Sequence, residues 1–172
     1  MTEQMIHLVD KLIKPDAYFG DLLQIDFADY ARQGFKLVLL DIDNTLARHG
    51  SREGDDFARE AVGRILQSGM ECRIVSNAAA GRARLYAATL ELPFTAMANK
   101  PSPRALRESC RMAGVLPNQT IMIGDQLLTD IAAARRAGCL AILVKPRFNH
   151  EAWNVRIKRL FEKLALRRFK IH

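Results

Sequence analysis

The sequence has few cysteines and no long apolar run. Its three cysteines, Cys72, Cys110 and Cys139, lie far apart in apolar surroundings, which predicts small core residues and neither a disulfide framework nor a zinc cluster. No stretch approaches the roughly 20 apolar residues of a membrane span, and the N-terminal segment carries acids and a lysine where a signal peptide is apolar. These features argue against an integral membrane protein. Free thiols favour a reducing compartment, so we expect a cytoplasmic protein, with peripheral contact at the inner face of the membrane left open.

Repeats, low-complexity tracts and long linkers rich in proline or glycine are also missing. The 172 residues are therefore expected to form one domain, residues 1–172. A chain of this length can bury roughly 70% of the surface that its unfolded form exposes. We expect residues 1–35 to be an N-terminal extension packed on the domain.

The positive charge is concentrated near the C-terminus. The formal net charge is +7, and residues 145–172, with nine lysines and arginines against Glu151 and Glu162, account for all of it. The preceding part of the chain holds equal numbers of basic and acidic groups. A neutral body is therefore predicted to carry a basic C-terminal segment.

Short β-rich runs alternate with segments of helical periodicity. We predict strands at residues 36–41, 72–76, 120–124 and 140–144, with a weaker candidate at 94–97. Glycines that can adopt a left-handed conformation end the predicted helices. These helices are expected to run from the Asp55 cap to Gly69, from Ser102 to Gly114, and over 128–137 to Gly138. The alternation predicts an α/β fold with a parallel sheet and right-handed crossovers.

Reactive side chains follow several of the predicted strands. Asp41 closes the first strand, Ser76 closes the second, and Asp125 follows a later one, while Lys100 follows the weaker candidate. Ligands of such sheets bind beyond the carboxyl ends of the strands, so these side chains are expected to converge. By itself, the pair Asp41 and Asp43 is more typical of a turn or a solvated loop. Ser76, Lys100 and Asp125, at the ends of the other predicted strands, favour a functional site instead.

Each residue type suits a step of phosphoryl transfer. Asp41 and Asp125 can give carboxylate oxygens to Mg²⁺, and Asp41 can attack phosphorus in line to form an acyl phosphate that water then cleaves. Asp43 fits a group that protonates the leaving oxygen and later takes a proton from the attacking water. The charge on the phosphoryl oxygens would be stabilised by Ser76, the Asn77 backbone and Lys100.

Four ordered segments closely resemble the motifs of the haloacid-dehalogenase (HAD) superfamily. They are DIDNTL at 41–46, SN at 76–77, KP at 100–101 and GDQLLTD at 124–130. The resemblance spans about residues 36–144 and implies a Rossmann-like, three-layer fold and a magnesium-dependent phosphatase that forms an aspartyl phosphate. It implies that Asp41 is nucleophile and metal ligand, that Asp43 is acid/base with its carbonyl on the metal, that Asp125 completes the metal site, and that Ser76 and Lys100 bind phosphate. We expect Asp130 to lie behind the metal ligands and to support them without binding the metal itself.

The longer segments KLIKPDAYFGDLLQIDFADYARQGFKLVLLDIDNTL and GDQLLTDI are similar to the YqeG-like branch of subfamily IIIA. That branch resembles eukaryotic phosphatidylglycerophosphate phosphatases. Residues 47–55 are too few for a cap domain, and the interval 77–99 holds only one helix and one strand of the core. We therefore expect no large cap domain. An open site favours a large or membrane-displayed substrate, with phosphatidylglycerophosphate as the first candidate.

The basic C-terminal segment has two open interpretations. Its apolar residues fall on one helical stripe, formed by Trp153, Ile157, Leu160, Phe161 and Leu164. Basic residues lie off that stripe at Arg156, Lys163, Arg167 and Lys170. Such a segment can lie on an anionic bilayer, but core packing explains the same stripe.

Other functions also stay open. A soluble nucleotide or sugar phosphate is the alternative substrate, and an RNA-associated or scaffold protein is the alternative from another class, although no RNA-binding aromatic motif accompanies the basic residues. A dehalogenase would leave Asp43 and Asp125 without a task. His49 and His150 lie in loops and are assigned no role.

Overall fold

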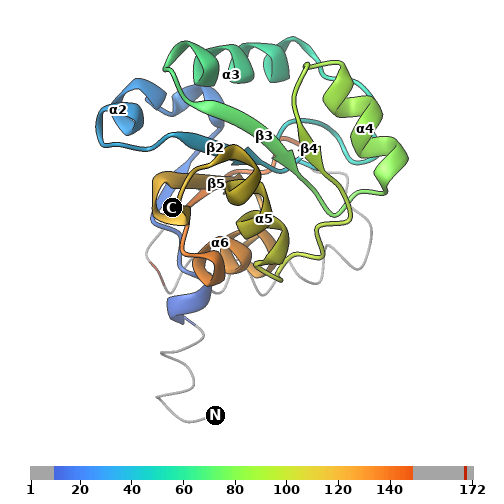
Figure 1. Ribbon diagram of the computed structural model, residues 1–172. Helices are drawn as coiled ribbons and strands as arrows, with labels where there is room; N and C mark the ends of the chain where they lie inside the picture. Colours follow the sequence, from blue (N-terminus) through green and yellow to red (C-terminus); the bar gives the residue numbers. More distant parts are fainter. Residues whose placement is uncertain (1–9, 149–168, 170–172) are drawn as a thin grey trace.

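The computed structural model describes residues 10–148 and 169, and a parallel β-sheet lies at its centre (Figure 1). Its strands are β1 (Ala17–Phe19), β2 (Leu37–Leu40), β3 (Glu71–Val75), β4 (Phe94–Thr95), β5 (Thr120–Gly124) and β6 (Leu140–Val144). Their spatial order is β1-β6-β5-β2-β3-β4, and all neighbouring strands are parallel. The predicted α/β fold with a central parallel sheet is confirmed.

Helices cover both faces of the sheet. The α-helices are α2 (Phe27–Arg32), α3 (Asp56–Gln67), α4 (Ala80–Ala88), α5 (Arg104–Ala113) and α6 (Ala132–Ala137), with short 3₁₀ turns η1 (Leu22–Gln24) and η2 (Pro117–Gln119). In Figure 1, α2, α3 and α4 lie on one side of the sheet and α5 and α6 on the other. The molecule therefore has the expected three layers.

Alternate residues of the central strand enter two separate cores. In β2, Val38 and Leu40 pack in the core beneath α2, α3 and α4, whereas Leu37 and Leu39 pack in the core beneath α5 and α6. All four side chains are fully buried. Successive side chains of a strand point to opposite faces, so a strand covered on both faces reads as an unbroken apolar run. This is why the sequence marks β2 so clearly.

The predicted boundaries are close to the observed ones. Strands β5 and β6 match residue for residue, and Asp55 caps α3 by accepting a hydrogen bond from the Ala58 amide at 2.9 Å. Helix α5 begins just after Pro103, at Arg104. The helix predicted over 128–137 is α6 preceded by a single π-helical turn, η3 (Leu127–Ile131). Such π turns are frequent at functional sites.

The sequence did not predict the edge strand β1. Its three residues pair with β6 in the register Ala17 to Ile142, and Asp16 continues the contact by exchanging hydrogen bonds of 2.8 Å with the Ala141 backbone. Arg135 holds Asp16 from the neighbouring helix at 2.8 Å. Residues 10–35, expected to be a packed extension, thus contribute a strand to the sheet.

The direction in which strands are added to the sheet reverses between β2 and β5. From β2 the chain runs outward through β3 and β4, then crosses back to β5 on the other side of β2. Ligands of open α/β sheets bind at such a reversal, beyond the carboxyl ends of the strands. Within residues 10–148 the loop between β2 and α3 and the connection from β3 to β4 carry no inserted domain, which confirms the predicted lack of a large cap. None of the described helices has the length and hydropathy needed to cross a bilayer.

Candidate active site

The Lys100 ammonium group lies at the centre of the polar cluster beyond these strands. Its Nζ donates to Asp41 Oδ1 at 2.6 Å, to Asp130 Oδ1 at 2.8 Å and to the Val75 carbonyl at 2.8 Å. The side chain is only 1% exposed. An ammonium group has three N–H donors, so all of them have partners. Lys100 therefore ties the end of β3 to carboxylates that follow β2 and β5.

Burial and charge act in opposite directions on the two central groups. Burial raises the pKa of Asp41 to about 6, although the nearby Lys100 charge and hydrogen bond act to lower it. Burial alone would lower the pKa of Lys100, but Asp130 and Asp41 raise it above its ordinary value. Lys100 therefore stays charged, and Asp41 is a carboxylate with unusually high proton affinity for its type.

Three buried carboxylates form a candidate metal site. Asp41, Asp125 and Asp130 each offer an oxygen, and these oxygens lie within 4.8 Å of one another. The Thr45 hydroxyl lies 3.5 Å from Asp125 Oδ1. Three carboxylates against one lysine leave an excess of buried negative charge, which requires a cation or protonation. Clustered carboxylate oxygens are the ligands that Mg²⁺ prefers, so the donor set fits this ion.

The π turn and Gly124 position Asp130 against the end of β5. Asp130 Oδ2 accepts from the Gln126 amide at 3.1 Å, so both carboxylate oxygens already have donors. A Cβ on Gly124 would lie 2.4 Å from Cβ, Cγ and Oδ2 of Asp130, which no side chain tolerates. Glycine is therefore required before Asp125. These contacts are compatible with the supporting role that we expect for Asp130.

Ser76 and Asn77 lie in the loop after β3. The Ser76 hydroxyl accepts from the Ala78 amide at 3.2 Å, and within the described residues its own O–H donates no hydrogen bond. The Asn77 side chain accepts from the Lys100 amide at 2.8 Å and donates to the Lys100 carbonyl at 3.2 Å. We expected Asn77 to contribute through its backbone, and its side chain additionally fixes the loop that carries Lys100.

Asp43 contacts a cation that the sequence interpretation missed. Arg82, from the first turn of α4, donates through both terminal nitrogens to the two Asp43 oxygens at 2.9 and 2.5 Å. His49 Nδ1 lies 3.4 Å from Asp43 Oδ1, on a side chain that is 72% exposed. Asp43 is not one of the three clustered carboxylates. Nothing local marks Arg82, because it lies 39 residues from Asp43 in the chain.

Arg147 braces the loop that carries Asp43. Its guanidinium donates to the Leu46 carbonyl and to Asp55 Oδ2, the latter at 2.9 Å, and stacks over the Phe57 ring at 3.8 Å. Its amide donates to the Asn44 carbonyl at 2.9 Å. This residue follows β6, and its contacts join the end of the sheet to the start of α3.

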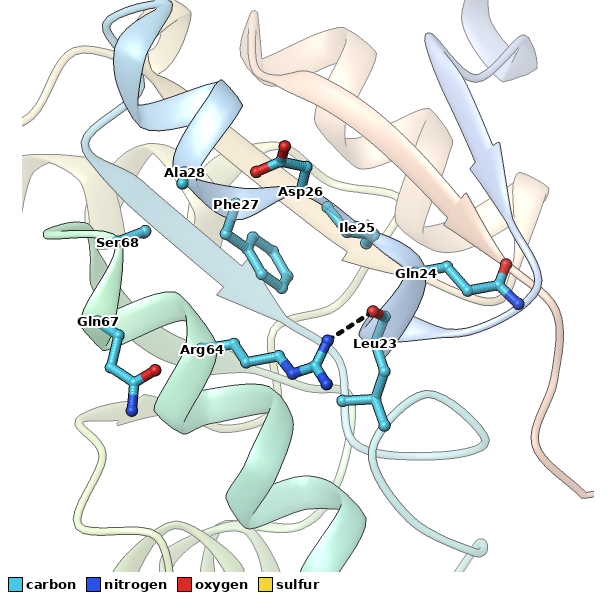
Figure 2. Close-up of a pocket in the computed structure, with 9 residues that line it drawn as sticks. All are labelled: Leu23, Gln24, Ile25, Asp26, Phe27, Ala28, Arg64, Gln67 and Ser68. Carbon is cyan, nitrogen blue, oxygen red and sulfur yellow. Dashed lines mark hydrogen bonds between the residues drawn. The ribbon is translucent and has the colours of Figure 1, made fainter.

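A separate groove of about 500 Å³ lies between η1, α2 and α3 (Figure 2). Its walls are formed by residues 23–28 with Arg64, Gln67 and Ser68, and Arg64 donates to the Leu23 carbonyl at 2.8 Å. None of the predicted site residues lines this groove. The candidate active site is instead the carboxylate cluster beyond β2 and β5.

Known proteins resemble this chain in sequence and in fold. A family model described as HAD-hydrolase-like matches residues 97–159. A HAD family hydrolase from Deinococcus radiodurans, solved with bound phosphate and sodium, superposes with a TM-score of 0.55 at 17% identity, over 74% of this chain and 88% of that one. The chain therefore resembles HAD-type hydrolases in sequence and in fold, and these likenesses support a phosphatase of this type.

Within that class, the chain is similar over nearly its whole length to the "Probable phosphatase YqeG" of Bacillus subtilis. The two are 28% identical over 163 residues, which cover 95% of each protein. It is also 29% identical over 144 residues to "Phosphatidylglycerophosphate phosphatase 1, chloroplastic" of Chlamydomonas reinhardtii, covering 78% of this chain and 54% of that protein. The chain thus spans about half the length of this second relative.

The raised pKa of Asp41 predicts a pH-dependent cost to folding in the metal-free protein. In the unfolded chain Asp41 titrates near 3.8, and in the folded chain near 6, so the folded state holds the proton more tightly. The stabilising effect of that proton is complete below about pH 4 and is lost as the pH rises through 6, an effect of roughly 3 kcal/mol.

This dependence can be isolated by comparing wild type with Asp41→Asn in excess chelator. Denaturant unfolding at pH 4.5 and at pH 7 should show the variant gaining stability relative to wild type as the pH rises. An equal difference at the two pH values would contradict the buried, high-affinity carboxylate.

Proposed function

We propose that this protein is a magnesium-dependent phosphomonoester phosphatase that acts through an aspartyl-phosphate intermediate. The observation that carries the proposal is the contact between Lys100 and Asp41, which orients one carboxylate at the strand ends beside two others. The Asp41 carboxylate attacks phosphorus, the bond from phosphorus to the leaving oxygen breaks, and water then cleaves the acyl phosphate.

Asp43 is the proposed acid and base of the two steps. It gives a proton to the leaving oxygen and later takes one from the attacking water. Its ion pair with Arg82 holds the carboxylate in one orientation. Lys100 and the Ser76 hydroxyl are proposed to stabilise the charge on the phosphoryl oxygens, with the Asn77 backbone beside them.

Asp41, Asp125 and the Asp43 carbonyl are the proposed magnesium ligands. When bound, the ion supplies a positive charge that offsets the repulsion between carboxylates and the substrate phosphate. Asp130 is proposed to act indirectly, because its two oxygens receive hydrogen bonds from Lys100 and from the Gln126 amide. In this arrangement Asp130 keeps Lys100 in place while Asp41 reacts.

A lipid phosphate such as phosphatidylglycerophosphate is the proposed substrate. The likeness to a phosphatidylglycerophosphate phosphatase of Chlamydomonas reinhardtii supports it, and so does the lack of an inserted cap within the described residues. Two apolar side chains are exposed near the site: Met97, at 71%, in the connection that leads to Lys100, and Leu128, at 36%, in the turn η3 that follows Asp125. Exposed apolar residues beside an open site suit contact with a bilayer.

Substitution of the nucleophile tests the mechanism. Asp41→Asn should lower turnover of a nitrophenyl phosphate at least a thousandfold, since the amide cannot attack phosphorus, while the circular dichroism spectrum stays that of wild type. Chelator should silence the wild-type enzyme, and Mg²⁺ should restore it. Near-normal activity of the folded variant, or full activity in excess chelator, would refute the proposal.

The basic C-terminal segment, proposed to bind anionic membranes, lies outside the described residues apart from residue 169 and its first residues, 145–148. Replacing Arg156, Lys163, Arg167 and Lys170 by Gln should weaken sedimentation with anionic vesicles, since each basic residue near such a surface contributes about 1 kcal/mol. Added salt should weaken wild-type binding as well.

Hydrolysis of a soluble nitrophenyl phosphate should survive in this quadruple variant and serves as the control. If the variant sediments with vesicles and cleaves lipid phosphate as well as wild type does, the segment has no membrane role. In that case a soluble phosphate becomes the better candidate substrate.

A further inference from the structure

Arg82 is the guanidinium in direct contact with Asp43. Its NH1 and NH2 groups donate to the two Asp43 oxygens, and NH1 also lies 3.4 Å from the Ser51 carbonyl. The two side chains are 17% and 18% exposed, so solvent still reaches both. A paired fork of this kind fixes the plane of the guanidinium as well as that of the carboxylate.

The Arg82 guanidinium has more donors than its protein contacts use. It carries five N–H groups, of which three serve Asp43 and Ser51. In the part of the chain that the structure describes, the other two N–H groups make no hydrogen bond. Arg82 can therefore bind an added anion without releasing Asp43.

Lys100, in contrast, has no N–H group left to bind an added anion. Its three donors are all used by Asp41, Asp130 and the Val75 carbonyl, and its side chain is 1% exposed. Its charge is thus directed at the reacting centre. A group of the substrate that lies away from the phosphorus would meet Arg82 instead.

The surroundings of Arg82 also favour an anion. The loop after Asp43 exposes Arg48, His49 and Arg52, and its one acidic residue before Gly54 is Glu53. His49 lies within 3.4 Å of Asp43. Arg48 and Arg52 outnumber Glu53 in this loop, and an excess of positive charge raises the local concentration of anions.

We propose that Arg82 is a specificity-determining residue that binds a second anionic group of the substrate, carried by the alcohol that leaves. This rests on the proposed function, in which Asp43 protonates the leaving oxygen. A cation held on Asp43 then lies on the leaving-group side of the site. The second anion would be a phosphodiester or a carboxylate, and a guanidinium binds either through two parallel hydrogen bonds.

A pair of soluble substrates with matched leaving groups tests the proposal. Glycerol 3-phosphate and glycerophosphoglycerol phosphate both release a glycerol-type alcohol, but only the second carries a phosphodiester. Wild type should prefer the second by roughly 10- to 100-fold in kcat/KM, the value of one hydrogen-bonded charge contact. Arg82→Gln should bring this ratio close to one, mainly through KM, and Arg82→Lys should keep part of it.

The control variant is Arg84→Gln, which removes an exposed arginine of the same helix and should keep the wild-type ratio. A ratio is independent of the fraction of folded enzyme, so partial misfolding of the Arg82 variants does not blur the result. If Arg82→Gln slows both substrates equally, Arg82 only orients Asp43 and the proposal is overturned.

A wild-type ratio near one, with both substrates hydrolysed, would also overturn the proposal while leaving the phosphatase function intact. If wild type hydrolyses neither substrate nor a nitrophenyl phosphate in the presence of Mg²⁺, the proposed function fails, and this inference fails with it.

Discussion

The structure of the site depends on one buried cation. Lys100 Nζ lies within 2.8 Å of oxygens from three places in the chain, namely Asp41, Val75 and Asp130. A buried ammonium group is tolerated only where hydrogen bonds and opposite charge replace its hydration. Removing one partner of such a group costs about 3–5 kcal/mol, because the remaining charge stays buried. The cluster therefore fixes the relative positions of the strand ends that carry it.

The fold provides this arrangement through its strand order. Strands β5, β2 and β3 are neighbours, so Asp125, Asp41 and Ser76 leave the sheet side by side. The connection after β4 then returns Lys100 to the same edge, where the Asn77 side chain holds its backbone at both the amide and the carbonyl. The π turn after β5 brings Asp130 against Gly124, and the absence of a Cβ there makes the approach feasible.

Much of this site could be predicted from the sequence because the relevant signals are local. The apolar runs at 37–40 and 120–124 mark buried strands, and carboxylates at their carboxyl ends must meet in a parallel sheet. Strand β1 was missed because three residues are too few to show a period, and its pairing depends on distant partners in β6. Arg82 was missed for a similar reason, since only the folded chain brings α4 against the loop after β2.

The pairing of Asp43 with Arg82 also gives Asp43 and Asp41 different chemical surroundings. Asp41 is buried beside Lys100 and faces the other acidic groups, whereas Asp43 is turned toward Arg82 in a partly exposed position. Two carboxylates in such different surroundings can take different roles at one pH. The proposed division into nucleophile and acid/base follows from these surroundings as well as from the order of the motifs.

The most direct test of the account is to find the phosphoryl group on the nucleophile. Asp43→Asn should slow hydrolysis of the acyl phosphate, so acid quenching of this variant during turnover of a nitrophenyl phosphate with Mg²⁺ should trap it. Mass spectrometry of the digested protein is expected to locate one phosphoryl group on the peptide at Asp41. A phosphoryl group on any other residue, or steady release of phosphate with no phosphorylated protein at any quench time, would contradict the account.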